Sequence, residues 1–319
     1  MTPLRLLIVK TTSMGDVVHA LPVVADILRH RPGTLIDWLV EAPFADLPKM
    51  HPGVRRVLPM QWRKWRGQLF QPSTWTAMAA LREELRAGPY DLVLDLQGLL
   101  KSAIWARQTR APVVGYDSSS IRDPAASWLY RRTVKISLQL HAVQRCRLLA
   151  AAHLRYAPPV DAPDFGLRAP SGGWARSGDY AVLIPNASRS AKHWPERQWA
   201  AVGNRLKERG MTPLVLWGRQ DEQSLAESIA ASCEGDVPPF LKVGEKASVL
   251  AGARQVVGLD TGFTHLAAAL GRPTLGIYCD HEPGLAGITG PGRVASIGGK
   301  GQVPSRADVL SLLDAQMRP

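Results

Sequence analysis

The sequence predicts an α/β protein built from two Rossmann-like, doubly wound domains. Short apolar runs alternate with helical patterns in both halves of the chain, and such alternation produces a parallel sheet covered by helices on both faces. A segment rich in proline and glycine, residues 157–179, separates the halves. With 319 residues, 45% of them hydrophobic, the chain is long enough to bury two ordinary cores. We therefore expect domains at residues 1–165 and 166–319.

The apolar runs predict the strands, and the longer periodic stretches predict the helices. In the first half we expect strand 4–9, helix 16–31, strand 35–40, helix 74–88, strand 90–96 and strand 111–116. In the second half we expect strand 180–185, helix 196–209, strand 212–218, helix 221–231, strand 255–260, strand 273–278 and a final helix over 305–317. The final helix follows the second domain in sequence, and packing back on the first domain is an alternative position for it.

The basic residues are concentrated in the first half. Residues 1–160 hold 22 Lys and Arg against 11 Asp and Glu, whereas residues 161–319 hold 17 against 16. Such an excess indicates that the first half faces an anionic partner, which can be a nucleic acid, a membrane surface or a charged substrate. A basic, solvated surface is the plain alternative.

Several classes of protein and of site are disfavoured. No apolar run approaches the roughly 20 residues of a membrane-spanning helix, and the first residues lack the cleavage site of a signal peptide. Three scattered cysteines and eight histidines have no spacing typical of disulfide or metal frameworks, and the motifs D-x-D, HExxH and G-x-S-x-G are absent. The sequence GPGRVA at 290–295 matches a dinucleotide fingerprint only formally, because no first strand of a βαβ unit precedes it. We expect a cytoplasmic protein without a metal site.

Ligands of open α/β sheets bind beyond the carboxyl ends of the strands, so the strand-to-helix junctions are the candidate sites. In the second half, Asp260, Thr261 and Gly262 form such a junction, and His265 follows in the first turn of the next helix. The free N–H groups of a helix start favour phosphate. A capped helix with a buried histidine is the structural alternative.

Two further junctions of the second half carry polar side chains. Ser188, Arg189 and Lys192 follow strand 180–185 and offer the hydroxyl and cationic donors that suit a diphosphate, although a solvated loop has the same composition. Glu222 follows strand 212–218, where a carboxylate can accept hydrogen bonds from ribose hydroxyls.

In the first half, Asp16 follows the first strand, and Gly15 is expected to allow a tight turn before it. A carboxylate at this edge can take the proton of a substrate hydroxyl, and helix capping is its structural alternative. Basic residues in segments 55–67 and 118–124 can hold an anionic acceptor near it. Trp62 and Trp65 lie among these cations and also permit contact with nucleic acid or a membrane surface.

Four segments together resemble the ADP-heptose:lipopolysaccharide heptosyltransferases of glycosyltransferase family 9. They are LLIVKTTSMGDVVHALP (6–22), KHWPERQW (192–199), DTGFTHLAAAL (260–270) and EPGLAGITGPG (282–292), within a resemblance that extends from residue 4 to about residue 315. They are most similar to the branch that adds the first heptose to Kdo. The resemblance implies the GT-B fold, in which two Rossmann-like domains face a central cleft, and an inverting transfer without a metal cofactor. It also implies ADP-heptose as donor and Kdo₂-lipid A as acceptor, at the inner face of the cytoplasmic membrane, with no nucleic-acid partner.

The resemblance also implies roles for individual residues, motif by motif. Asp16 matches the catalytic base, and Lys192 matches the residue that neutralises the leaving diphosphate. The matching donor-binding positions are Ser188, Arg189, Lys192, Glu222, Leu241, Asp260, Thr261, Gly262 and His265. The matching acceptor-binding positions are Ser13, Gly15, Arg63, Arg66, Arg122 and His141. The first domain is then the acceptor domain and the second binds ADP-heptose.

The chain departs from the family pattern in one place, and other functions stay open. Ala187-Ser188 stands where the family has paired threonines, so one hydroxyl is lost. A type II heptosyltransferase or another GT-B sugar-nucleotide transferase is the nearest alternative. A basic nucleic-acid-binding protein and a non-enzymatic membrane scaffold are more distant ones.

Overall fold

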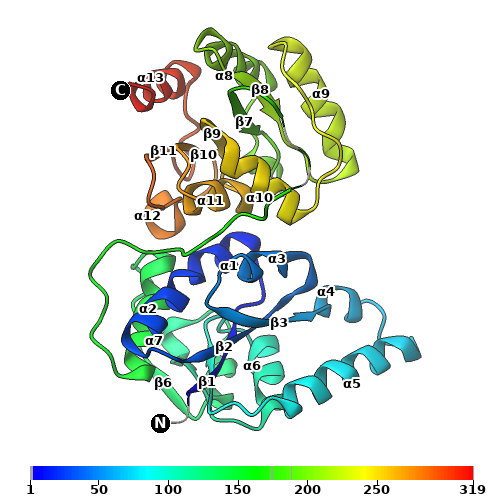
Figure 1. The fold of residues 1–319 in the computed structure, drawn as a ribbon, viewed down its shortest axis with the longest axis vertical. Coiled ribbons are helices and arrows are strands. Elements are labelled where there is room, and N and C mark those ends of the chain that lie inside the picture. Colours follow the sequence, from blue (N-terminus) through cyan, green and yellow to red (C-terminus); the bar gives the residue numbers. More distant parts are fainter. Residues whose placement is uncertain (1–2, 173, 175, 188, 319) are drawn as a thin grey trace. The chain divides into compact units, whose positions relative to one another are not determined.

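The chain forms two compact units, residues 1–166 and 167–319, in a computed structural model that describes residues 3–172, 174, 176–187 and 189–318 (Figure 1). Ser188, a predicted donor-binding residue, lies outside the described residues. The division falls one residue from the boundary expected from the sequence. Each unit is described below by itself.

Unit 1 is built on a six-stranded sheet with the order β3-β2-β1-β4-β5-β6, in which every neighbouring pair is parallel. The chain begins at the centre, winds to one edge and then crosses to the other, which is the doubly wound order. The strands are β1 (Arg5–Val9), β2 (Leu35–Glu41), β3 (Val54–Met60), β4 (Leu92–Asp95), β5 (Val113–Tyr116) and β6 (Arg132–Val134).

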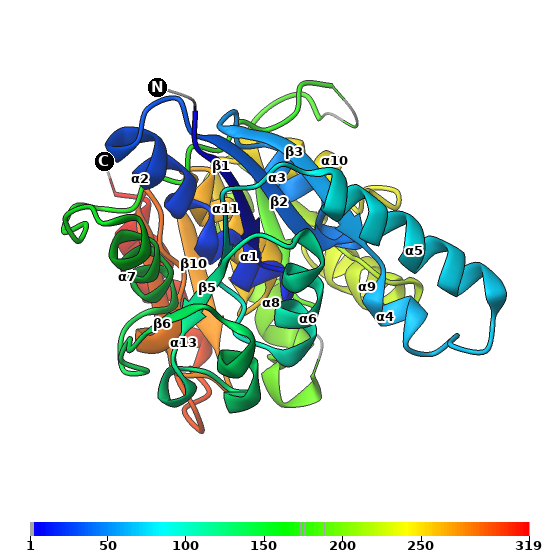
Figure 2. The same ribbon diagram turned by 90° about the horizontal axis from the view of Figure 1, so that it is seen from below.

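Helices cover both faces of this sheet (Figure 2). The helices are α1 (Met14–Ala20), α2 (Pro22–His30), α3 (Asp46–Lys49), α4 (Trp62–Trp65), α5 (Pro72–Ala87), α6 (Leu100–Ala106) and α7 (Ala142–Leu154), with short 3₁₀ turns η1 (Ala42–Phe44), η2 (Arg107–Thr109), η3 (Ser118–Ser120) and η4 (Pro124–Leu129). On one face, Leu81 and Leu85 of α5 and Trp105 of α6 share a buried core with Leu7 and Val9 of β1. Helices α1 and α2 both pack against α7.

Unit 2 repeats the architecture with five parallel strands in the order β11-β10-β9-β7-β8. The strands are β7 (Tyr180–Ile184), β8 (Thr212–Val215), β9 (Gln255–Leu259), β10 (Thr274–Tyr278) and β11 (Val294–Gly298). The helices are α8 (Glu196–Glu208), α9 (Gln223–Ser232), α10 (Val243–Gly252), α11 (Gly262–Ala269), α12 (Pro283–Ala286) and α13 (Arg306–Gln316), with 3₁₀ turns η5 (Ser190–Lys192) and η6 (Gln220–Glu222). Val309 and Leu313 of α13 join a core with Trp199 of α8, so the final helix packs within its own unit.

The structure corrects the sequence-based prediction near the first junction. The expected helix 16–31 is two helices, α1 and α2, because Pro22 has no N–H to continue the hydrogen-bond ladder and starts a new helix instead. The expected tight turn at Gly15 is wrong. Helix α1 begins at Met14 after Ser13 as its N-cap, so Gly15 is an ordinary residue of the first helical turn.

Several elements were not predicted. The sequence pattern does not predict the strands β3 and β6 of unit 1 and β11 of unit 2, nor the helices α3, α4, α6, α7, α10 and α12. Strand β3 contains Arg55, Arg56 and Pro59, and such residues argue against a strand unless it lies at the edge of a sheet, which is where β3 lies. Within the described part of the chain, no helix combines the length and apolar character needed to cross a membrane.

Candidate functional site

A compact charged cluster occupies the carboxyl end of β9 in unit 2. Lys192 Nζ donates to Asp260 Oδ2 at 2.5 Å and to the backbone oxygen of Asp260 at 3.2 Å. His265 Nε2 lies 3.2 Å from the other carboxylate oxygen, Oδ1. The three side chains are only 15%, 11% and 5% exposed for Lys192, Asp260 and His265 respectively. The structure thus brings together three of the residues that the sequence placed at two separate junctions.

The electrostatics of this cluster keep Asp260 ionised. Burial by itself raises the pKa of the Asp260 carboxyl, but hydrogen bonds from His265 and Lys192 and their charges hold that pKa well below its usual range. A carboxylate held in this way fixes the ammonium group of Lys192 at the start of α11. A fixed cation beside a helix N-terminus is an arrangement suited to a phosphate group.

The first turn of α11 is fastened to the end of β9. Thr261 is the N-cap, Gly262 is the first helical residue, and Thr264 Oγ1 donates to the backbone oxygen of Leu259 at 2.6 Å. Gly258 permits this approach, since a Cβ at that position would lie 2.3 Å from Thr264 Oγ1. The helix therefore presents its first N–H groups at a rigid position next to Lys192.

Two other predicted donor residues of unit 2 lie in different surroundings. Arg189 is exposed, and its Nη2 lies 3.3 Å from Asp280 Oδ2, just after β10. Leu241 is buried immediately before α10. The described contacts of these two residues do not join them to the Lys192–Asp260–His265 cluster.

Glu222 lies where β8 leads into η6, and one of its oxygens is already engaged. Its Oε2 accepts hydrogen bonds from the N–H groups of Gly218 at 2.8 Å and Arg219 at 3.0 Å. Its Oε1 lies 4.0 Å from Arg219 Nε. The carboxylate thus closes the turn after β8 through Oε2, and its Oε1 lies at the outer limit of an ion pair with Arg219.

Lys246 of α10 is a buried lysine next to Glu222. Its Nζ lies 4.8 Å from the ring centre of Phe263 and 5.5 Å from that of Phe240. Burial lowers the pKa of Lys246 from 10.5 to about 8, although the negative charge of Glu222 opposes this shift. Burying the ammonium group of this lysine lowers the stability of the fold, which points to a role for Lys246 in binding.

In unit 1, Asp16 is held at the first junction by a capping box. Its Oδ2 accepts from the backbone N–H of Ser13 at 2.7 Å and from the Ser13 hydroxyl at 2.8 Å. The preceding loop is held in turn by Gln97, whose Oε1 accepts from the N–H groups of Thr11 at 2.8 Å and Thr12 at 2.9 Å. Asp16 is therefore not the N-cap, which is Ser13, but the third helical residue, and its hydrogen bonds from Ser13 hold the carboxylate in one position through Oδ2.

A buried carboxylate organises the basic residues beside this junction. Glu41, at the end of β2, is 1% exposed, and its burial raises the pKa of its carboxyl. The charges of Lys101, Arg63 and Arg66 oppose that rise, in that order of size. Lys101 Nζ also lies 3.2 Å from Thr12 Oγ1. The predicted acceptor residues Arg63 and Arg66 are thus linked through Glu41 and Lys101 to the loop that carries Ser13.

The remaining predicted acceptor residues divide into one that joins this region and one that does not. His141 is the N-cap of α7, and its ring centre lies 5.5 Å from that of His19, one helical turn after Asp16 on α1. Arg122 is exposed between η3 and η4, and among the described residues no contact links it to Asp16. Trp65 is buried with its ring centre 5.5 Å from that of Trp105, so it is not available to stack on a nucleic-acid base.

Comparison with known proteins identifies the family. The profile described as glycosyltransferase family 9 (heptosyltransferase) matches residues 78–308. The chain belongs to this family. It is 42% identical over 294 residues to lipopolysaccharide heptosyltransferase 1 of Pseudomonas aeruginosa, which covers 91% of this chain and 83% of the relative.

Solved structures agree with the family assignment. The structure of the Escherichia coli heptosyltransferase WaaC with ADP has a TM-score of 0.90 and 36% identity, covering 98% of this chain and 100% of its own. The same E. coli enzyme with ADP-2-deoxy-2-fluoro heptose has a TM-score of 0.86 and 35% identity, covering 99% and 100%. The prediction of a GT-B glycosyltransferase with two Rossmann-like units is confirmed.

This family 9 glycosyltransferase contains candidate site residues that the sequence did not reveal. Lys246, Glu41, Lys101 and Gln97 were not predicted. Gln97 and Lys101 follow strand β4 closely, so the rule that selected the other junctions would have found them. Lys246 lies inside a helix and Glu41 at the end of a strand. The local sequence around each residue does not show whether its charged side chain is buried or solvated.

The described residues contain no group of three or more His, Cys, Asp or Glu side chains gathered so as to hold a metal ion.

Proposed function

We propose that this glycosyltransferase transfers heptose from ADP-heptose to the Kdo of the lipopolysaccharide inner core, carried by Kdo₂-lipid A. The transfer inverts the anomeric centre and uses no metal ion. One observation carries the proposal. A lysine fixed by a buried carboxylate stands at a helix N-terminus, Lys192 at the start of α11, in a chain 42% identical to a lipopolysaccharide heptosyltransferase 1.

In the proposed reaction, Asp16 is the base. It takes the proton of a Kdo hydroxyl while that oxygen attacks C1 of the heptose from the face opposite ADP. The new bond joins the Kdo oxygen to C1, and the bond from C1 to the diphosphate oxygen breaks. The capping hydrogen bonds from Ser13 occupy Oδ2, so Oδ1 receives the proton.

The departing ADP carries the electron pair of the broken bond, and unit 2 supplies the groups that stabilise it. Lys192 and the first N–H groups of α11 offer positive charge that is already in place before the bond breaks. Asp260 and His265 position the lysine. Arg189 and Ser188 complete the diphosphate contacts in this proposal, with Thr261 and Gly262 at the helix start.

The nucleoside is proposed to lie beside Glu222 and Lys246. Oε1 of Glu222, which takes no part in the turn after β8, accepts from ribose hydroxyls, and Leu241 borders the adenine. Lys246, held between the rings of Phe240 and Phe263, supplies a donor at the same place.

The acceptor is proposed to bind unit 1. The residues proposed to contact it are Ser13, Gly15, Arg63, Arg66, Arg122 and His141. Since this acceptor is a lipid, the enzyme works as a peripheral protein on the inner face of the cytoplasmic membrane.

The first test is ADP release from ADP-heptose in the presence of Kdo₂-lipid A, without added metal and with EDTA. Acceptor-dependent release supports a metal-independent heptosyltransferase. ADP binding without release on this acceptor would contradict the proposed acceptor or sugar and leave the nucleotide site standing. If the protein neither binds ADP nor releases it from ADP-heptose, the donor assignment is contradicted as well.

The role of Asp16 is separated from its capping role by two variants. Asp16→Asn keeps an oxygen that accepts from Ser13 but cannot act as a base, whereas Asp16→Ala loses both functions. We expect both to lower kcat by roughly 10²- to 10⁴-fold with the Kd for ADP unchanged. Only Asp16→Ala should also lower stability, by about 1 kcal/mol. Near-normal turnover in Asp16→Asn would show that another group is the base.

A further inference from the structure

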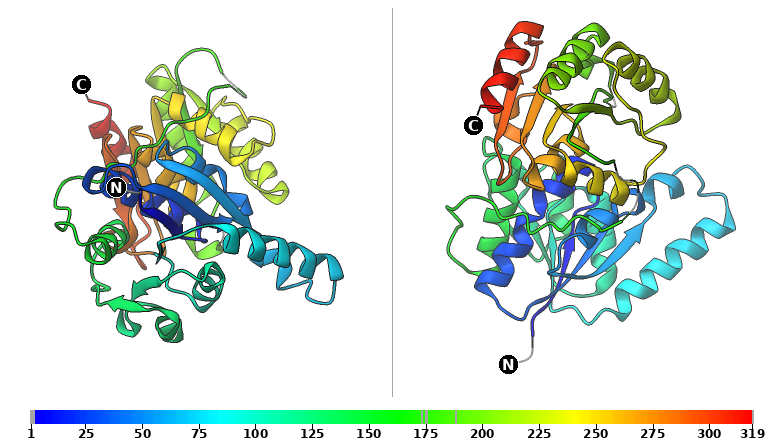
Figure 3. Two further views of the ribbon diagram at one scale, coloured as in Figure 1. Left: turned by 60° about the horizontal axis from the view of Figure 1, so that its bottom comes forward. Right: turned by 45° about the horizontal axis from the view of Figure 1, so that its top comes forward.

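Unit 1 exposes a group of large apolar side chains at one projecting end. We call residues 66–75, the loop between α4 and α5 with the first turn of α5, the α4–α5 tip. Phe70 is fully exposed, at 104% of its reference area, and Trp75 and Leu69 are 57% and 42% exposed. Figures 2 and 3 show α5 and the loop before it projecting from the sheet of unit 1. Grouped apolar exposure of this kind marks an interaction surface.

The tip is held in place by the fold. On one side, Trp65 at the end of α4 is buried in the core with Trp105 of α6. On the other, Trp75 Nε1 donates to the backbone oxygen of Leu69 at 2.7 Å and fastens the loop to the first turn of α5. The exposed rings of Phe70 and Trp75 are therefore presented by a folded segment with fixed ends.

The charge around the tip has one sign. Between Asp46 and Glu83 the sequence contains no acidic residue and seven basic ones. Arg63 and Lys64 lie on α4 next to the tip, Arg66 is the first residue of the tip, and all three are exposed. Exposed aromatic and aliphatic side chains beside a purely basic segment match the interfacial region of an anionic bilayer, where rings insert at headgroup depth and cations contact lipid phosphates.

We propose that the α4–α5 tip docks this enzyme on the surface of an anionic phospholipid membrane. Phe70 and Trp75 enter the headgroup region, and Lys64 of α4, which is not assigned to the acceptor, contacts the lipid phosphates. The proposal deepens the proposed function and rests on it only in that a lipid-linked acceptor would be presented at this surface. Unit 1 also carries Asp16, so docking and the proposed acceptor site belong to one compact unit.

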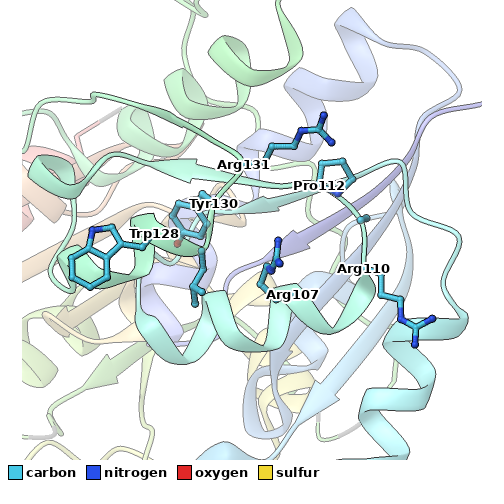
Figure 4. A pocket seen from close by; sticks show the side chains of 8 residues that line it. Arg107, Arg110, Pro112, Trp128, Tyr130 and Arg131 are labelled. Atoms are coloured by element: carbon cyan, nitrogen blue, oxygen red, sulfur yellow. The ribbon is translucent and has the colours of Figure 1, made fainter.

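An exposed aromatic residue elsewhere in unit 1 provides the matched control. Trp128 is 83% exposed beside a cavity of about 340 Å³ whose lining includes Arg107, Arg110 and Arg131. This cavity precedes β5 and β6, at the amino end of the sheet, opposite the edge that carries Asp16. Figure 4 shows Arg110 and Arg131 pointing away from each other, so their charges do not converge on one ligand.

The first experiment reports where position 70 goes. All three native cysteines are buried, so Phe70→Cys can be labelled selectively with an environment-sensitive fluorophore. The probe is a set of vesicles of phosphatidylethanolamine with phosphatidylglycerol, without donor or acceptor. We expect a blue shift and at least a roughly threefold loss of quenching by aqueous iodide. A label that stays fully quenched while the protein sediments with the vesicles would overturn the proposal.

The second experiment measures binding to the same vesicles by sedimentation. We expect Phe70→Ser to lower the partition coefficient roughly tenfold, because a fully exposed ring contributes only when it inserts. Phe70→Trp should retain binding, and Trp128→Ser should change it less than twofold. Equal losses in Phe70→Ser and Trp128→Ser would overturn the proposal. The same dependence on Phe70 for binding to duplex DNA would also overturn it, in favour of a nucleic-acid surface.

Activity separates this proposal from the proposed function. With Kdo₂-lipid A in vesicles, Phe70→Ser should raise the apparent KM roughly tenfold, whereas KM for a de-acylated, water-soluble acceptor should not change. A protein that docks through Phe70 but transfers no heptose would contradict only the proposed function. A protein that transfers heptose with no effect of Phe70 on either readout would contradict only the docking surface.

Discussion

Lys246 illustrates how a single residue can cost stability for the sake of binding. Its pKa is lowered from 10.5 to about 8 because the folded state buries the ammonium group. At pH 7 the lysine is charged in both the folded and the unfolded state, so desolvation of that charge lowers the stability of the folded state. We expect Lys246→Met to raise the free energy of unfolding at pH 7, without ligand, by about 1–3 kcal/mol. Between pH 8 and 10.5 the folded wild type binds fewer protons than the unfolded chain, so its stability rises with pH and the gap to the variant narrows.

The measurement is urea unfolding of wild type and Lys246→Met at pH 7 and pH 9.5, together with titration by ADP. We expect the variant to bind ADP roughly tenfold more weakly, since it loses the donor beside Glu222. A variant that is less stable than wild type by the same amount at both pH values would contradict the claim that the buried charge of Lys246 lowers stability. Unchanged ADP affinity would remove Lys246 from the nucleotide site.

For single residues, the sequence could predict a place in the site where the position of the residue along a strand determines its position in space. Lys192, Asp260 and His265 follow strand ends, and parallel strands bring their carboxyl ends to one edge, so their meeting was foreseeable. Lys246 was not, because the burial of its ammonium depends on Phe240 and Phe263, which reach it from other parts of the chain. For Asp16 the sequence offers a base or an N-cap. In the structure Ser13 is the N-cap and Asp16 accepts hydrogen bonds from it, while the role of Asp16 as base remains a prediction.

Among the elements of unit 1, α2 and α7 are joined by a buried ion pair. Arg147 Nε and Nη2 donate to the two carboxylate oxygens of Asp26 at 2.7 and 2.9 Å, and both side chains are 1% exposed. Nη2 of the same guanidinium also lies 2.9 Å from Asp161 Oδ1, in the segment that leads towards unit 2. One arginine therefore fixes two helices and the start of the connecting segment.

Because Asp26 is buried and its carboxylate is paired with Arg147, removing Arg147 leaves a buried negative charge without compensation. We expect Arg147→Met to lower the free energy of unfolding of unit 1 by about 3–5 kcal/mol, and the double variant Asp26→Leu/Arg147→Met to recover most of the loss. Arg29→Met is the matched control, because the Arg29 pair with Asp161 is half exposed and its loss should change the free energy of unfolding far less than the loss of Arg147. Urea unfolding measures all three, and an additive double variant would contradict a direct interaction.

The elements themselves were predictable where local pattern and long-range packing agree. Strands β7 and β9 are buried along their whole length and β1 is buried except at Arg5, and the apolar runs predict the ends of all three within one residue. Strand β3 was missed because its stability depends on Arg55 and Arg56 meeting Asp37 of β2, with Arg55 Nη2 at 2.7 Å and Arg56 Nε at 3.3 Å from Asp37 Oδ2. Ion pairs between side chains of two different strands produce no recognisable pattern in the local sequence of either strand.

At the scale of the whole molecule, the sequence separated the chain into two units, and the charge divides along nearly the same line. Residues 1–160 hold 22 basic and 11 acidic side chains, whereas residues 161–319 are almost balanced. In unit 1 the exposed arginines Arg63, Arg66 and Arg122 contribute to this excess. In unit 2 the cation proposed to act on the donor, Lys192, is 85% buried and already paired with Asp260.

This division predicts that salt acts differently on the two proposed substrates. Raising NaCl from about 0.05 M to about 0.5 M shortens the Debye length to a few ångströms and screens exposed charges far more than buried ones. We expect KM for a de-acylated Kdo acceptor to rise at least roughly tenfold, whereas the Kd for ADP rises less. Initial-rate kinetics and ADP titration across the salt series measure both, and the water-soluble acceptor excludes any contribution from membrane binding. Equal salt dependence of the two constants would mean that the basic excess of unit 1 has another use than holding the acceptor.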